Sequence, residues 1–200
     1  MTTRCPHIID DDAAVRDALA WLLKAHDIDS VVWSSAGDFL QQSEPTSCGC
    51  LIVDIRMPEM SGIELFDRIR RQSGDLPVIF LTGHGDVPMA VQAIKDGAFD
   101  FLEKPVDEVL LIDRVRAALR LGGERANVAA HNQEIQSLLK ELTIREREIM
   151  ECVLNGKLNK VIADELGIAM RTVEVHRSRV FEKMGVRSAV ELSQLLSSVN

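Results

Sequence analysis

The chain has 200 residues, 46% of them hydrophobic and 27% charged, and its formal net charge is −8. This composition is typical of a folded globular protein and excludes an intrinsically disordered chain. No apolar run approaches the roughly 18 residues of a membrane-spanning helix. The first residues also contain no apolar segment of the length found in signal peptides. We therefore expect a cytoplasmic protein without a membrane partner.

The charge is unevenly distributed along the chain. Residues 1–122 contain 12 Lys and Arg against 20 Asp and Glu, a net charge of −8, whereas residues 123–200 contain 11 of each kind. Within the second part, residues 168–187 hold five basic and two acidic residues, a local charge of +3. An acidic segment followed by a neutral one with a basic stripe indicates two functions on one chain.

Short apolar runs alternate with amphipathic segments in the first part of the chain. Such runs, bounded by turn signals, are typical of strands buried on both faces. We expect strands near residues 8–9, 31–33, 50–53, 78–81 and 99–103, and helices over residues 13–25, 35–42, 61–71, 89–95 and 109–120. This alternation predicts an α/β domain over residues 1–121, flavodoxin-like and doubly wound around a parallel five-stranded sheet.

Polar residues follow the ends of four of these strands. They are Asp10–Asp12, Asp54, Thr82 and Lys104. Ligands bind beyond the carboxyl ends of parallel strands, so these side chains should converge on one site. The set suits a hard divalent cation and a phosphoryl group.

Each of these residues has an expected role. Asp54 stands alone at its strand end and is the expected nucleophile, since a carboxylate that attacks phosphorus gives an acyl phosphate. Asp10 and Asp11 would hold Mg²⁺, which needs only one or two carboxylates besides water and phosphate. Lys104 and the Thr82 hydroxyl would each bind a phosphate oxygen.

Over about residues 4–121 the sequence resembles the receiver domain of two-component response regulators. Four motifs carry the resemblance: Asp10-Asp11, Asp54-Ile-Arg-Met-Pro-Glu-Met-Ser-Gly62, Thr82-Gly-His-Gly-Asp86 and Lys104-Pro105. The resemblance implies that a sensor histidine kinase donates the phosphoryl group to Asp54. It also implies Mg²⁺, or Mn²⁺ in its place, bound by Asp11, Asp54 and the backbone carbonyl of Arg56, with Asp10 behind them.

The same resemblance implies roles for further residues. Phe101 matches the family's aromatic switch, which works together with Thr82; core packing is the alternative interpretation of this phenylalanine. Arg56 and His84 match positions that tune the lifetime of the phosphate. The Lys104–Pro105 peptide bond is implied to be cis.

Residues 122–141 begin with Gly122-Gly123 and continue in polar, alanine-rich sequence. We expect an interdomain linker that is largely helical. Apolar residues at helical spacing near its end leave open whether this helix pairs with its twin in a dimer.

Residues 142–200 show only helical patterns, so we expect an all-α four-helix domain. Thr143 and Glu146 form a capping box at its start. Residues 159–176 predict a helix, a tight turn at Gly167 and a second helix, which is a helix-turn-helix. Its expected core residues are Val161, Ile162, Leu166, Ile168, Val173 and Val180.

In a helix-turn-helix the second helix enters the major groove of DNA. Glu174, Val175 and Ser178 would then face base edges, although Glu174 could instead orient Arg171 or Arg177. The expected phosphate contacts are Lys160, Thr172, Arg177, Arg179 and Lys183. A plain helical hairpin without DNA is the alternative interpretation, but residues 142–196 resemble the LuxR/GerE output domain.

The order of the two domains resembles the response regulators of the FixJ/NarL type. This resemblance implies a phosphorylation-dependent transcriptional regulator with operator DNA and RNA polymerase as partners. We expect a homodimer after phosphorylation, formed by residues about 87–103. Residues in this segment include an apolar set suited to a two-fold contact, among Met89, Val91, Ala93, Ile94 and Lys95.

Two other classes of function stay open. A Mg²⁺-dependent phosphate hydrolase would need a general acid two residues after the nucleophile, and Arg56 stands there, so we expect no enzyme. The second class is a phosphorylation-switched module whose helical end binds a protein instead of DNA. The basic residues of the expected recognition helix argue against it.

Overall fold

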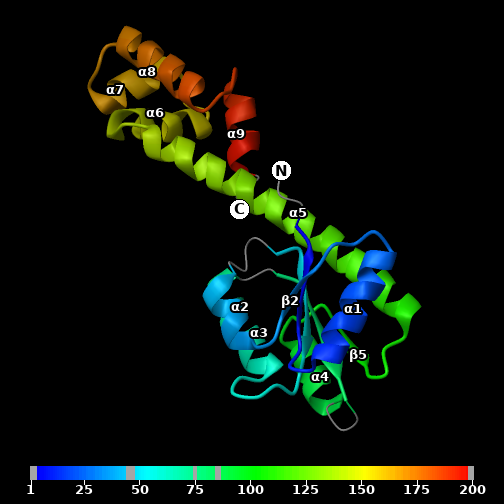
Figure 1. Ribbon diagram of the computed structural model, residues 1–200. Coiled ribbons are helices and arrows are strands. Elements are labelled where there is room, and N and C mark those ends of the chain that lie inside the picture. The colour runs from blue at the N-terminus through cyan, green and yellow to red at the C-terminus, as the bar shows by residue number, and fades with distance from the viewer. Residues whose placement is uncertain (1–3, 44–47, 74–75, 84–86, 198–200) are drawn as a thin grey trace. The chain divides into compact units, whose positions relative to one another are not determined.

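The computed structural model describes residues 4–43, 48–73, 76–83 and 87–197 (Figure 1). The chain divides into two compact units, Met1–Ala126 and Asn127–Asn200. No helix among the described residues is long and apolar enough to cross a membrane.

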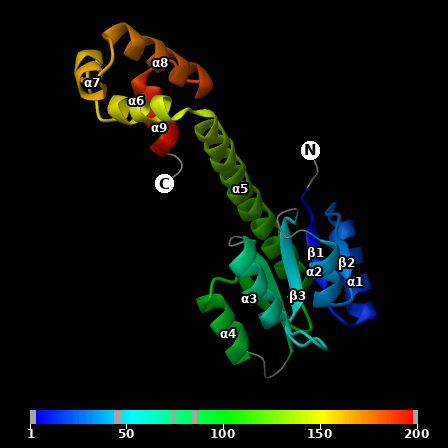
Figure 2. The same cartoon turned by 90° about the vertical axis from the view of Figure 1, so that its left-hand side faces the viewer.

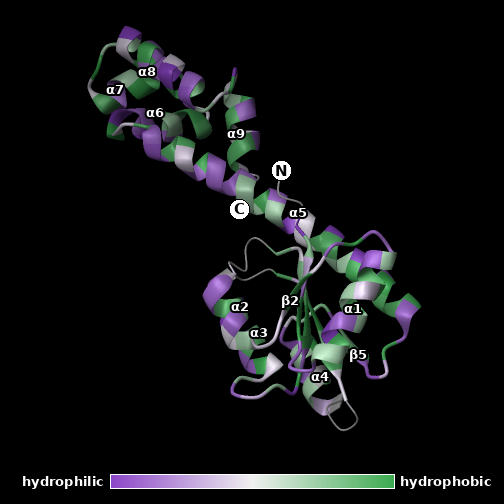
Figure 3. Cartoon of the chain, viewed as in Figure 1, coloured by the Kyte–Doolittle hydropathy of each residue, from purple (hydrophilic) through white to green (hydrophobic). Residues whose placement is uncertain are grey.

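The first unit is built on one parallel sheet with the strand order β2-β1-β3-β4-β5. The strands are β1 Pro6–Ile9, β2 Val31–Trp33, β3 Cys50–Asp54, β4 Val78–Thr82 and β5 Asp100–Glu103. Figure 3 shows these strands as largely hydrophobic, because helices cover both faces of the sheet. The expected flavodoxin-like fold is confirmed.

Two hydrophobic cores lie on opposite faces of the sheet. The helices are α1 Ala13–Ala25, α2 Ala36–Gln42, α3 Gly62–Ser73, α4 Val87–Lys95 and α5 Glu108–Glu141. Side chains of α1 and α5 pack with Ile8 and Ile52 on one face. Side chains of α2, α3 and α4 pack with Ile9 and Phe80 on the other (Figure 2).

Helix α4 has an apolar exposed side. Met89, Val91 and Ile94 are exposed, whereas Ala93 is 3% exposed and packs into the core. Ala93 therefore lies on the inner face of the amphipathic helix, and the exposed members of the apolar set are Met89, Val91 and Ile94.

Helix α5 is longer than the expected helix over residues 109–120, since it continues without interruption to Glu141. The helix expected over residues 109–120 and the largely helical linker expected over residues 122–141 are therefore parts of one continuous helix. Gly122 is buried, and a Cβ atom there would lie 2.2 Å from the carbonyl oxygen of Gly49. The glycine lets the helix backbone approach the segment before β3, rather than ending the helix.

As far as residue 197, the second unit contains the end of α5 and four further helices. These are α6 Ile144–Leu154, α7 Asn159–Leu166, α8 Met170–Lys183 and α9 Ala189–Ser197. The capping box of Thr143 and Glu146 is present at the start of α6. Ile162, Val173 and Val180 are buried as expected, but Val161 is 42% exposed, because its neighbours Ile162 and Ala163 face the core.

Candidate functional site

Three charged side chains converge at the carboxyl end of the sheet. Asp10 follows β1 and is 1% exposed, and Asp54 ends β3 and is 7% exposed. Lys104 follows β5, and its Nζ donates to Asp10 Oδ2 at 2.8 Å and to Asp54 Oδ1 at 2.5 Å. The Lys104–Pro105 bond is cis. One ammonium group therefore bridges two buried carboxylates.

The surroundings shift the pKa values of this cluster. Burial raises the pKa of the Asp54 carboxyl, while the hydrogen bond and the charge of Lys104 act in the opposite direction. Burial by itself would lower the pKa of Lys104, but the bonds to Asp10 and Asp54 outweigh it and raise this pKa. Lys104 therefore stays a cation between the two acids.

Every polar group of Asp10 has a partner. Its N–H donates to the Trp33 carbonyl at 3.3 Å, and its Oδ1 accepts the N–H of Asp12 at 2.9 Å. Nη1 of Arg16 donates to its carbonyl oxygen at 2.7 Å. The following residue, Asp11, is exposed. The loop between β1 and α1 is thus held from several sides. The motif patterns did not reveal Arg16, whose partner is a backbone atom.

The backbone after β3 holds the other oxygen of Asp54. The N–H of Arg56 donates to Asp54 Oδ2 at 2.8 Å. A Cβ atom on Gly62 would lie 2.3 Å from the carbonyl oxygen of Asp54, so only glycine fits where α3 begins. Gly62 belongs to one of the motifs, but the sequence pattern does not reveal this role, because the contact depends on how the loop returns to the strand.

The two expected switch residues lie on neighbouring strands. Thr82 ends β4 and is fully buried, and its hydroxyl donates to the carbonyl of Gly83 at 3.4 Å. Phe101 on β5 is partly buried, packs against the core and pairs with Phe80 in the strand register. His84 lies outside the described residues.

The donor set fits a hard divalent cation. Asp10, Asp11 and Asp54 offer only oxygen atoms, which Mg²⁺ prefers, and one or two carboxylates suffice for it. Among the described residues, no three His, Cys, Asp or Glu side chains already surround one point. The carboxylates of Asp10 and Asp54 are instead bridged by Lys104.

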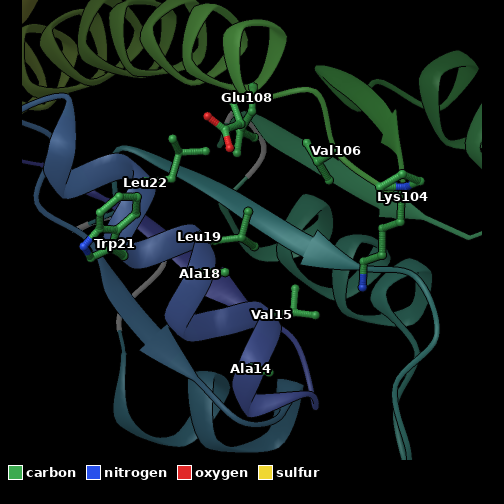
Figure 4. A pocket seen from close by; sticks show the side chains of 11 residues that line it. Ala14, Val15, Ala18, Leu19, Trp21, Leu22, Lys104, Val106 and Glu108 are labelled. Carbon is green, nitrogen blue, oxygen red and sulfur yellow. The ribbon is translucent and has the colours of Figure 1, made fainter.

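A largely apolar groove of about 610 Å³ begins at Lys104. Figure 4 shows side chains of α1, among them Val15 and Leu22, facing Val106 across it. Trp21 lines the groove away from Lys104 and is 74% exposed. The groove therefore offers a large apolar surface directly beside the acidic cluster.

Helices α7 and α8 form the expected helix-turn-helix. Gly167 ends α7 in the left-handed conformation, with a φ of 63°. The side chains expected to meet DNA bases are exposed on α8: Glu174, Val175 and Ser178. Three expected phosphate contacts are exposed as well: Lys160, Thr172 and Arg179.

The two other expected phosphate contacts have partners inside the unit. Arg177 donates to Asn159 Oδ1 at 2.9 Å, and its guanidinium lies 5.4 Å from the centre of the Phe181 ring. Lys183 donates to Oε2 of the buried Glu146 at 2.7 Å. The hydrogen bond from Lys183, and to a smaller extent the one from the Thr143 N–H, lowers the pKa of Glu146 to about 2. Both cations thus connect α8 to other helices, a role that the sequence pattern does not predict.

Comparisons with known proteins cover most of the chain. The family model "Response regulator receiver domain" matches residues 7–116, and "Bacterial regulatory proteins, luxR family" matches residues 140–196. The transcriptional regulatory protein FixJ of Azorhizobium caulinodans is 44% identical over 94% of this chain and 90% of that protein. The C4-dicarboxylate transport transcriptional regulatory protein DctR of Rhodobacter capsulatus is 44% identical over 94% and 97%, respectively.

A solved structure is also similar over the full length. The response regulator StyR has a TM-score of 0.89 at 39% identity, with 98% of each chain covered. Both the acidic cluster with Lys104 and the helix-turn-helix lie within the matched segments. The chain therefore belongs to the response regulators in which a receiver domain is followed by a domain of the luxR family.

Proposed function

We propose that this protein is a phosphorylation-controlled transcriptional regulator that accepts a phosphoryl group on Asp54 from a sensor histidine kinase. One observation carries the proposal: Asp54 is held by Lys104 and by the Arg56 amide at the carboxyl end of the sheet, on the same chain as a helix-turn-helix. The relatives FixJ and DctR are named as transcriptional regulatory proteins.

The chemistry is the transfer of a phosphoryl group from a histidine nitrogen to a carboxylate oxygen. An oxygen of Asp54 attacks phosphorus, the phosphorus–nitrogen bond breaks, and an acyl phosphate forms. Lys104 then binds a phosphate oxygen in place of Asp54. Mg²⁺ or Mn²⁺, when bound, supplies positive charge that offsets the charge of the phosphoryl group. The ion would be bound by Asp11, Asp54 and the Arg56 carbonyl. Asp10 would lie next to these ligands without binding the ion directly.

The phosphate would act on the rest of the chain through Thr82 and Phe101. The Thr82 hydroxyl turns to a phosphate oxygen, and the ring of Phe101 moves inward into the space that Thr82 leaves. Arg56 and His84 tune the lifetime of the phosphate. The exposed side of α4 then becomes the contact of a homodimer.

The kinase is proposed to dock in the groove beside α1. A phosphorylated histidine must reach Asp54, and the groove begins at Lys104 and continues along an apolar surface to Trp21. Trp21→Ala should slow transfer from the kinase by more than tenfold, because exposed tryptophans often dominate the energy of an interface. Phosphorylation by acetyl phosphate, which needs no docking, should keep its rate; equal loss with both donors would contradict this site.

Operator DNA is the proposed ligand of α8. Glu174, Val175 and Ser178 would face base edges, and Lys160, Thr172 and Arg179 would contact phosphates, with RNA polymerase as a further partner. The internal contacts of Arg177 and Lys183 favour a structural role for both. Arg56 two residues after Asp54 supports a regulator rather than a hydrolase, since a guanidinium donates no proton usefully.

The proposal is tested by intact mass after incubation with acetyl phosphate and Mg²⁺. We expect one added phosphoryl group in the wild type and none in Asp54→Ala or without Mg²⁺. The phosphorylated protein should bind DNA more tightly than the untreated one, with an affinity that falls steeply with salt. Rapid hydrolysis of a phosphate ester, or an adduct that persists in Asp54→Ala, would contradict it.

A further inference from the structure

Arg16 makes an unusual contact beside the acidic cluster. It lies in the first turn of α1, where a positive charge is unfavourable because the helix dipole places positive charge at that end. Three aspartates, Asp10–Asp12, lie just before it in the chain. Within the described ranges its side chain forms no ion pair, and its hydrogen bond goes to the Asp10 carbonyl at 2.7 Å.

This hydrogen bond fixes one of the two peptide groups that flank Asp11. A peptide group is planar, so holding the Asp10 carbonyl also holds the nitrogen of Asp11. The next peptide is held as well, because the N–H of Asp12 donates to Asp10 Oδ1 at 2.9 Å. The Asp10 side chain is itself bound by Lys104 at 2.8 Å. The backbone on both sides of the exposed Asp11 is thus set by hydrogen bonds.

We propose that Arg16 is a positioning residue for metal binding: by holding the Asp10 carbonyl, it directs the Asp11 carboxylate toward Asp54. The inference rests on the proposed function, in which Asp11 and Asp54 bind Mg²⁺. Arg16 itself touches neither the metal nor the phosphoryl group. Its contribution is to remove the conformational freedom that Asp11 would otherwise lose on binding the ion.

Positioning and simple electrostatics predict opposite effects when Arg16 is replaced. Removing a positive charge near an acidic site strengthens the attraction of that site for a cation. Electrostatics alone therefore predicts tighter Mg²⁺ binding by Arg16→Met. Positioning predicts weaker binding, since the peptide before Asp11 becomes free to turn.

The test is the Mg²⁺ dissociation constant of the full-length protein, measured by titration of backbone amide chemical shifts. We expect Arg16→Met to raise this constant about tenfold, and Arg16→Lys, which keeps a charged donor, to restore most of the loss. Lys24→Met removes a positive charge from the exposed last turn of the same helix and should change the constant less than twofold. At saturating Mg²⁺, Arg16→Met should regain most of its rate of phosphorylation by acetyl phosphate.

Equal or tighter Mg²⁺ binding by Arg16→Met would overturn the proposal. If this variant does not fold, Arg16→Leu decides, since it also loses both the charge and the N–H donor; Mg²⁺ binding as tight as in the wild type, or tighter, would overturn the inference. Asp11→Asn distinguishes a failure of the metal site from a failure of the role of Arg16. If Asp11→Asn binds Mg²⁺ as the wild type does, the proposed metal site itself is wrong; if it loses binding while Arg16→Met does not, only the role of Arg16 is wrong.

Discussion

His7 is a buried titratable residue on the strand that leads to Asp10. It lies on β1, and its Nδ1 accepts the indole N–H of Trp33 at 3.0 Å. The Phe39 ring contacts its imidazole edge-on, with 5.9 Å between ring centres. Burial lowers the pKa of His7 below its usual 6.5, because a charged imidazolium is poorly solvated there. The cross-strand hydrogen bond from Trp33 therefore depends on a neutral His7.

This burial makes the stability of the first unit depend on pH. The unfolded chain takes up a proton near pH 6.5, whereas the folded chain does so only at lower pH. Stability should be full above pH 6.5 and fall toward pH 5, with a slope of at most about 1.4 kcal/mol per pH unit from this residue. His7→Asn keeps an acceptor for Trp33 and should lose this slope. Urea unfolding followed by tryptophan fluorescence measures it, since both tryptophans lie in this unit; identical slopes would contradict the prediction.

Glu174 offers a prediction about DNA sequence preference. It is exposed on α8, and in the described part of the chain its carboxylate forms no ion pair with Arg171 or Arg177. A free carboxylate in the major groove accepts a hydrogen bond from cytosine N4, whereas a glutamine pairs with adenine. Glu174→Gln should therefore shift the preference at one operator position from cytosine to adenine, by about 1–3 kcal/mol.

The matched control is Glu182→Gln, which removes an exposed charge near the end of the same helix. It should strengthen binding to all sequences alike, because it reduces repulsion from phosphates without changing a base contact. Selection of bound sequences from a random DNA library separates the two effects. A profile for Glu174→Gln that equals the Glu182→Gln profile would show that Glu174 reads no base.

Residue types at strand ends sufficed to predict that Asp10, Asp54 and Lys104 meet, because a parallel sheet brings its carboxyl ends together. The roles of Arg177 and Lys183 could not be predicted in this way. Their partners Asn159 and Glu146 stand 18 and 37 residues away, and helix periodicity gives no pairing between helices. A basic residue on an expected recognition helix is equally compatible with both roles.

Alanine substitutions at two adjacent glycines of α5 can show how closely this helix approaches the segment before β3. A Cβ atom at Gly122 would lie 2.2 Å from a backbone oxygen, which cannot move aside easily, whereas a Cβ atom at Gly123 would have no atom of the described residues within 4 Å. Gly122→Ala should destabilise the first unit by about 2 kcal/mol through overpacking. Gly123→Ala should stabilise the helix by about 0.5–1 kcal/mol. Urea unfolding measures both changes, and equal effects would contradict the close contact at Gly49.

The helices and strands of the first unit were largely predictable, because their apolar residues recur at the periods of the two structures. Helix α1 has the expected bounds of residues 13–25. The helical linker was expected, but its continuity with the helix before it was not predictable, since a glycine pair is the usual sign of a helix end. Only Gly49, 73 residues earlier in the chain, explains why Gly122 is needed inside the helix.

At the scale of the whole molecule, the proposed function requires phosphorylation to change the state of assembly. Met89, Val91 and Ile94 on α4 are 45%, 42% and 36% exposed, an apolar set that a second copy would cover. Ile94→Glu places two like charges opposite each other in a twofold contact, which disfavours the dimer. The variant should still gain one phosphoryl group on Asp54 and yet sediment as a monomer.

Loss of the dimer should weaken binding to the full operator strongly, although each protein–DNA contact within one half-site stays intact. Two linked recognition helices gain an effective concentration worth a factor of about 100 or more, and a monomer forfeits it. Phosphorylated Ile94→Glu should therefore bind a two-half-site operator about 100-fold more weakly than the phosphorylated wild type, yet bind one half-site equally well. Val32→Glu introduces the same charge at an exposed valine on β2, at the opposite edge of the sheet from β5, and should dimerise normally. If the phosphorylated wild type binds the full operator tightly as a monomer, assembly through α4 is not how phosphate controls DNA binding.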